Sequence, residues 1–215
     1  DENISAHEGV LENTAAAVDG GGGAVAPTPR SDKERAFLDA LRGHLTGMTD
    51  AEIAAGPPPV AASPQGALER VPLPWFLKKP IMDALLRDVH HYLFDVEFAP
   101  PGKPPVRIQQ TIRRSFVDKL GAPMVTRPHV VVSHSMGTVI AYDCLKRVAE
   151  CVPVDGLITI GSPLGIDEVQ DKLQPGWTRR DGFPHEKIAL GWINLFDRLD
   201  PVCGFDPKLA NDFRK

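Results

Sequence analysis

The stretch from Val130 to Thr138 constrains the fold of this chain more than any other. It reads Val-Val-Val-Ser-His-Ser-Met-Gly-Thr, so a β-branched run is followed at once by small and polar residues. A short β-branched run of this kind is typical of a strand buried on both faces of a parallel sheet. We therefore predict a buried strand over 129–133, a sharp turn at Ser135 and a helix over 136–150.

Amphipathic helical patterns fill much of the N-terminal half. Ser31 and Glu34 have the spacing of a capping box, which predicts that a helix begins there. Further helices are predicted over 81–93, with Pro80 in the first turn, and over 105–120. The apolar residues on one face of the first two helices are Phe37, Leu38, Leu41, Leu45, Ile81, Met82, Leu85, Leu86, Val89 and Leu93.

Two more short apolar runs, 156–160 and 192–196, follow the predicted helix after Ser135. Strands that alternate with helices imply a parallel sheet joined by crossover connections, so the expected fold class is α/β. The Gly-rich residues 1–30 and the Pro-rich residues 57–70 are predicted to be irregular.

Composition narrows the range of functions. The 215 residues fit one domain, 1–215, and the net charge of −4 gives no electrostatic basis for binding nucleic acid. No apolar run reaches the roughly 18 residues of a transmembrane helix. Three cysteines, an odd number without metal-ligand spacing, favour free thiols, a reducing compartment and hence a cytoplasmic location. Because the chain begins with Asp1 rather than Met, a removed leader is an open alternative.

The sequence Ser133-His134-Ser135-Met136-Gly137 resembles the nucleophile elbow of α/β-hydrolase serine esterases and lipases, usually written Gly-x-Ser-x-Gly. Ser133 replaces the first glycine but is small enough for the turn. The resemblance implies a mostly parallel α/β-hydrolase-type sheet, flanked by helices, with its core over 125–215. Residues 31–120 would then form a helical cap or lid, although packing on the core is the plainer interpretation of these helices.

The same resemblance implies roles for three neighbouring residues. Ser135 would be the nucleophile, and the backbone N–H of Met136, at the positive end of the following helix, would stabilise the oxyanion. His134 is expected to support the site without reacting, or to be a packing residue, rather than to be the general base, because adjacent side chains point away from each other.

A second match lies at the end of the last predicted strand. There Asp200-Pro201-Val202 resembles the segment that delivers the triad acid, so the resemblance implies that Asp200 is this acid. Asp197 is the alternative, although it also suits a simple ion pair with Arg198. Ser162, in a Gly-Ser-Pro sequence after the second strand, serves either a chain reversal or the lining of a pocket.

The general base is the member of the triad that the sequence leaves open. In this family the order is Ser, Asp, His, yet no histidine follows Asp200. A His-Gly loop that would supply the second oxyanion donor also lacks a clear counterpart, since His7-Glu8-Gly9 has no strand before it. Three hypotheses follow: the chain is incomplete at both ends, His185 is the base, or the protein is a non-catalytic binding relative.

The expected function is therefore the hydrolysis of carboxylic esters through an acyl-enzyme, without a metal or organic cofactor. The apolar N-terminal helices favour a small acyl ester or lipid-like substrate. Thioesterase, phospholipase A and acyltransferase activities are alternatives that the turn alone does not separate, and the oligomeric state is left open.

Overall fold

The computed structural model describes residues 27–55, 75–99, 101–102, 104–122, 127–173, 186–196, 200, 202–203 and 209, with side chains omitted for 48–55 and 75–81. Several sequence predictions lie outside these residues: the irregular segments 1–26 and 57–70, the His7 loop, His185 and Asp197.

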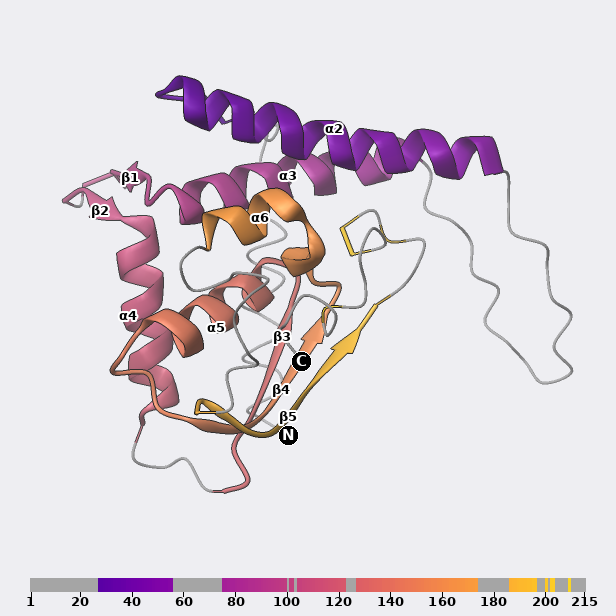
Figure 1. Ribbon diagram of the computed structural model, residues 1–215. Coiled ribbons are helices and arrows are strands. Elements are labelled where there is room, and N and C mark those ends of the chain that lie inside the picture. The colour runs from indigo at the N-terminus through magenta and orange to yellow at the C-terminus, as the bar shows by residue number, and fades with distance from the viewer. Residues whose placement is uncertain are drawn as a thin grey trace, which may run out of the picture.

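The described residues form a mixed α/β structure around a three-stranded parallel sheet (Figure 1). Its strands are β3 (Val130–His134), β4 (Val154–Ile160) and β5 (Ile188–Leu195), adjacent in that order. β5 begins four residues before the predicted 192. In the pairing with β4, Val154 lies opposite Ile188 and Gly156 lies opposite Gly191. β5 thus has one more residue than β4 between these two pairs. The prediction was based on the apolar run 192–196, and the irregularity before Gly191 separates this run from the first residues of the strand.

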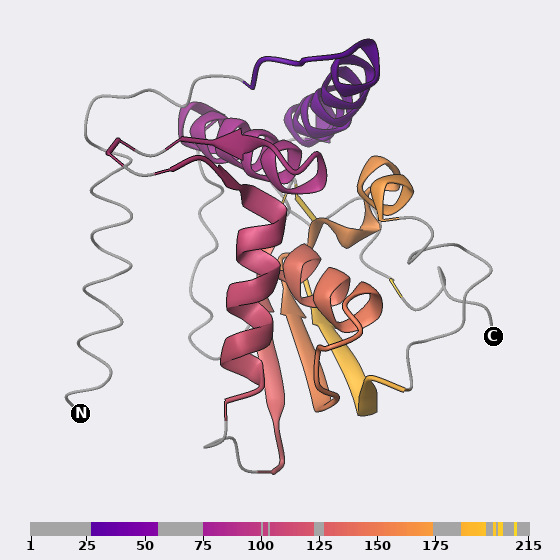
Figure 2. The same ribbon diagram turned by 90° about the vertical axis from the view of Figure 1, so that its left-hand side faces the viewer.

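Two helices cover one face of this sheet (Figure 2). They are α5 (Met136–Arg147), which follows Ser135 directly, and α4 (Ile108–Leu120). Their apolar residues pack against the inward side chains of all three strands. This cluster consists of Leu120, Ala141, Cys144, Leu145, Cys151, Val154, Leu157 and Ile188. The three cysteines are free thiols, as predicted, and all are buried.

The prediction that β3 is buried on both faces is wrong. Burial alternates along the strand, and the side chain of Val132 is 62% exposed. In the register of the sheet Val132 lies beside Ile158, which pairs in turn with Ile193, and Ile193 is 57% exposed. The physical reason is that α4 and α5 both pack on the opposite face.

α4 also begins later than predicted. Val106–Arg107 forms a short strand, β2, antiparallel to β1 (Glu97–Phe98), and the helix begins only at Ile108. The first turn of α4 is capped from a distance, since Asp95 Oδ1 accepts hydrogen bonds from the backbone N–H of Gln109 at 2.9 Å and of Gln110 at 3.4 Å.

The helices α2 (Asp32–Ala55) and α3 (Trp75–Leu93) cross the top of the structure as drawn in Figure 1. α3 begins five residues before Pro80, so this proline lies beyond the first turn, contrary to the prediction. A proline there removes one intrahelical hydrogen bond, and the helix continues through it. The two helices share an apolar core with α5 and with the segment after β4, which includes a 3₁₀ turn, η1 (Pro163–Gly165), and α6 (Asp167–Lys172).

The predicted apolar faces of α2 and α3 are confirmed where side chains are described. They are buried in one cluster through Phe37, Leu38, Leu41, Leu45, Met82, Leu85, Leu86, Val89 and Leu93. The capping box is half formed: the Glu34 N–H donates to Ser31 Oγ at 3.2 Å, whereas the Glu34 carboxylate accepts from the Arg30 N–H at 2.8 Å.

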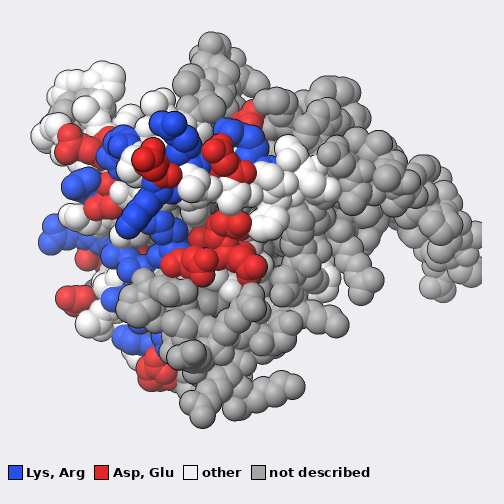
Figure 3. Space-filling view, turned by 45° about the horizontal axis from the view of Figure 1, so that its top comes forward, with Lys and Arg blue, Asp and Glu red and all other residues white. Residues whose placement is uncertain are grey.

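The outer surface near α2 carries acidic and basic side chains side by side (Figure 3). Within the described part of the chain, no helix combines the length and the apolar character needed to cross a lipid bilayer.

Candidate active site

Ser135 stands between β3 and α5 in an unusual backbone conformation, with φ 48° and ψ −125°. Among the described residues, only Ser135 and Asp95 have positive φ without being glycine. A conformation of this kind costs on the order of 1–3 kcal/mol and persists only where surrounding contacts enforce it. The sharp turn predicted at Ser135 is therefore present, and it is strained.

Backbone hydrogen bonds hold Ser135 on both sides. Its N–H donates to the carbonyl of Ile160, at the end of β4, at 2.9 Å. Its carbonyl accepts from the Thr138 N–H at 2.9 Å and from Thr138 Oγ1 at 2.7 Å. The turn is thus attached to the neighbouring strand and to the first turn of α5.

The small residues that flank the turn face each other across it. A Cβ atom added at Gly137 would lie 3.9 Å from the Cβ of Ser133, which is an ordinary van der Waals contact. Ser133 therefore fits on its side of the turn, and the turn has room for one further methyl group at Gly137.

Ser135 is half-buried and directly precedes the N-terminus of α5. Met136 is the first residue of α5, and the first N–H groups of a helix have no acceptor within the helix. The aligned peptide dipoles add a partial positive charge at this end. The Met136 N–H, at this end of α5, is thus without an acceptor within the helix, and its role as an oxyanion donor stays a prediction.

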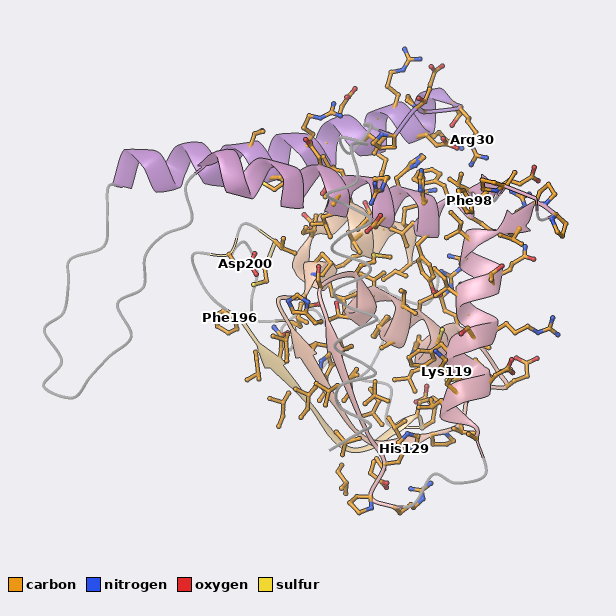
Figure 4. The ribbon with its side chains drawn as sticks, turned by 180° about the vertical axis from the view of Figure 1, so that it is seen from behind. Arg30, Phe98, Lys119, His129, Phe196 and Asp200 are labelled. Atoms are coloured by element: carbon orange, nitrogen blue, oxygen red, sulfur yellow. The ribbon has the colours of Figure 1, made fainter. Side chains whose placement is uncertain are left out.

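Asp200 lies beside the carboxyl end of the sheet, far from His129 at the start of β3 (Figure 4). Its Oδ1 accepts the Val202 N–H at 2.8 Å, and its Oδ2 accepts the thiol of Cys203 at 3.3 Å. Oδ2 also lies 3.2 Å from where a Cβ on Gly161 would be. The carboxylate is therefore fixed against the turn that follows β4, at the same sheet edge as Ser135.

His134 approaches the same point as Asp200. Its Nε2 lies 3.5 Å from the position of a Cβ on Gly161, so both side chains adjoin this glycine. Gly161 has φ 55°, which glycine adopts without steric cost. His134 was predicted either to support the site without reacting or to be a packing residue, and its side chain is exposed rather than packed in the core. Its approach to Asp200 was not predicted. This approach follows from the sheet register, in which His134 pairs with Ile160, one residue before Gly161, and the sequence alone carries no signal for it.

Ser162 is 2% exposed, and its hydroxyl lies 2.8 Å from Thr138 Oγ1. It also accepts the Leu164 N–H at 3.2 Å and so opens η1. Of the two interpretations of Ser162, the structure supports the chain reversal, because the hydroxyl is buried against α5. Thr138, its partner, was not singled out from the sequence. Across the described ranges, no cluster of three or more His, Cys, Asp or Glu side chains is arranged to hold a metal ion.

Comparison of the chain with known proteins gave no match to a protein family, to a curated protein or to a solved structure.

Proposed function

We propose that this protein is a serine hydrolase of the α/β-hydrolase family that cleaves carboxylic esters. The observation that carries the proposal is the strained conformation of Ser135, at φ 48° and ψ −125°, between a parallel strand and a helix. A nucleophile elbow needs this geometry because it lifts the serine hydroxyl above the end of the sheet while aiming a helix N-terminus at the reacting carbonyl.

In the proposed reaction, a histidine base removes the proton of Ser135 as Oγ attacks the acyl carbonyl. The resulting oxyanion accepts a hydrogen bond from the Met136 N–H, the alcohol leaves with the proton from the base, and an acyl-enzyme remains. Water then repeats the attack and releases the acid. A single donor to the oxyanion is typically worth about 10²–10³ in kcat.

Asp200 is proposed to orient the histidine base and to stabilise the imidazolium. Its position at the carboxyl end of the sheet, with its carboxylate held by Val202 and Cys203, supports this assignment. The acid must lie at this edge, because the nucleophile also lies there.

The substrate is proposed to be a small acyl ester or lipid-like molecule, with α2 and α3 acting as a cap. These helices share one apolar core with Val139 and Tyr142 of α5, and Met136 packs against it. A cap of this kind would place apolar surface near Ser135 and favour an apolar acyl group over a charged one.

The test is labelling of the full-length protein with a fluorophosphonate probe, which phosphonylates activated serines. Ser135→Ala should abolish labelling, whereas the matched control Ser133→Ala, two residues away in the same turn, should keep it. A folded protein that does not label would exclude the enzyme and favour the alternative of a non-catalytic binding protein. Initial rates with p-nitrophenyl esters of increasing acyl length, and with a thioester, then separate an esterase from a thioesterase.

A further inference from the structure

Two buried hydroxyl groups, those of Thr138 and Ser162, lie behind the Ser135 turn. We propose that they are positioning residues that fix the direction of the Met136 N–H, the oxyanion donor of the proposed reaction. The inference rests on the proposed function, and neither residue would touch the substrate.

The hydroxyls form one continuous chain of hydrogen bonds. The Leu164 N–H donates to Ser162 Oγ at 3.2 Å, Ser162 Oγ lies 2.8 Å from Thr138 Oγ1, and Thr138 Oγ1 donates to the Ser135 carbonyl at 2.7 Å. This chain runs from η1, after β4, to the strained residue.

The direction of the chain follows from counting protons. A carbonyl oxygen can only accept, so the single hydroxyl proton of Thr138 is used on Ser135. The hydrogen bond between the two hydroxyls must then be donated by Ser162. Each hydroxyl both donates and accepts, an arrangement in which neighbouring hydrogen bonds polarise and strengthen one another.

The chain acts on the Met136 N–H through the peptide plane. The Ser135 carbonyl and the Met136 N–H belong to one planar trans peptide, so they point in opposite directions. Fixing the carbonyl with two hydrogen bonds from Thr138 therefore fixes the N–H on the other side of the plane. Without the hydroxyl bond, only the Thr138 N–H holds the Ser135 carbonyl. The peptide plane can then rotate more freely, and the direction of the Met136 N–H is no longer fixed.

Burial and anchoring make the chain rigid. Thr138 is 0% exposed and Ser162 is 2% exposed, so solvent does not compete for their hydrogen bonds. The Ser162 end of the hydrogen-bond chain is fixed to the sheet as well. The N–H of its neighbour Gly161 donates to the Leu195 carbonyl at 3.0 Å. The turn after β4 is thereby linked to β5 and, through Thr138, to the elbow.

The experiment compares Thr138→Val, Thr138→Ser and Ser162→Ala in the full-length protein. The matched control is Thr159→Val, since Thr159 is a second fully buried threonine with two hydroxyl hydrogen bonds, to Asn194 at 2.7 Å and from Trp192 at 2.8 Å. Urea unfolding establishes that each variant is folded. kcat and KM are measured with p-nitrophenyl acetate, together with the rate of fluorophosphonate labelling.

Thr138→Val should lower kcat and the labelling rate about 10- to 100-fold at nearly constant KM, which is the signature of an interaction made in the transition state. Thr138→Ser should restore most of the wild-type kcat. Thr159→Val should retain the wild-type kcat, although its free energy of unfolding should be similar to that of Thr138→Val. The inference is overturned if Thr159→Val loses as much kcat as Thr138→Val, or if Thr138→Ser is as slow as the valine variant.

Amide hydrogen exchange gives a readout that does not depend on activity. The Ser135 N–H, bonded to Ile160, should exchange at least tenfold faster in Thr138→Val and Ser162→Ala, but not in Thr159→Val. A wild-type protein that never labels would refute the proposed function while leaving this exchange test intact. Unchanged Ser135 exchange in both variants would refute the positioning role itself.

Discussion

The phenol of Tyr92 donates a 2.6 Å hydrogen bond to the carboxylate of Asp143, which is fully buried in the helix that follows Ser135. Arg113 of α4 donates two further bonds to the same carboxylate, at 2.6 and 2.8 Å. The pKa of the Tyr92 phenol lies far above its usual range, mainly because the phenol is buried. The negative charge of Asp143 raises this pKa further. One carboxylate thus joins α3, α4 and α5.

Asp143→Ala should destabilise the protein strongly. The substitution leaves the Arg113 guanidinium and the Tyr92 hydroxyl without their buried acceptor, which typically costs about 3–5 kcal/mol. Arg147→Ala is the control, because Arg147 contacts Asp143 from the same helix and is 27% exposed, a setting worth only about 0.2–1 kcal/mol. Urea unfolding measures the free energy of unfolding of both variants. Equal losses in the two would contradict a central role for Asp143.

Asp200→Asn should lower kcat by about 10⁴-fold if Asp200 orients the base, because an amide stabilises the wrong tautomer of the histidine. The carboxylate's contacts with Val202 and Cys203 allow an asparagine of the same shape, so the fold should be retained. Asp197→Asn is the comparison. If only the Asp197 substitution abolished ester hydrolysis, the assignment of the acid would be wrong.

Gly161→Ala should impair both stability and turnover. Its φ of 55° disfavours alanine, and the added Cβ would lie 3.2 Å from Asp200 Oδ2. A loss of about 1–3 kcal/mol is expected from the backbone conformation. Gly137→Ala should be neutral or slightly stabilising, because its Cβ meets only an ordinary contact and alanine favours a helix by up to about 1 kcal/mol. Thermal unfolding and rates of ester hydrolysis are measured for both variants. A larger loss in Gly137→Ala than in Gly161→Ala would refute the described geometry.

Asp155 should make stability depend on pH at the acid end. Its Oδ2 accepts the His129 N–H at 2.6 Å and its Oδ1 accepts from Arg127 at 2.6 Å, and these contacts hold its pKa below the ordinary 3.8. The fold therefore favours the carboxylate form. Its stabilising effect is present above pH 3.8 and is lost as the pH falls through the lowered pKa.

Asp155→Asn should accordingly be less stable than the wild type at pH 7. The difference should narrow as the pH falls below about 4, because the unfolded chain then takes up a proton at Asp155, and it should vanish only below the lowered pKa of the native carboxyl. Urea midpoints at several pH values measure the difference, and a gap that is independent of pH would count against this role. High salt should reduce the part that Arg127 contributes, since this arginine is largely exposed.

The parts of the fold that the sequence predicted correctly are those set by local patterns. The strand before Ser135, the turn itself and the apolar faces of α2 and α3 all follow from neighbouring residues. The missed features depend on partners far along the chain. Asp95, for example, caps α4 from 14 residues away, and the burial of β3 depends on which face α4 and α5 occupy.

The candidate site divides in the same way. Ser135 and Met136 could be named as candidates because the turn and the residues around it form one continuous segment. The approach of His134 to Asp200 depends on how the chain returns after β5, and the Thr138–Ser162 contact spans 24 residues. Neither relation leaves a local pattern, so neither could be inferred before the strands were placed side by side.

The tethers of Ser135 have a consequence for how this position could change during evolution. They run through its N–H and carbonyl, and within the described residues no hydrogen bond uses its side-chain oxygen. The conformation of the turn therefore does not depend on whether the side chain at position 135 carries oxygen or another atom. A cysteine could replace the serine without rebuilding the scaffold, so the reactive atom and the scaffold that presents it can vary independently.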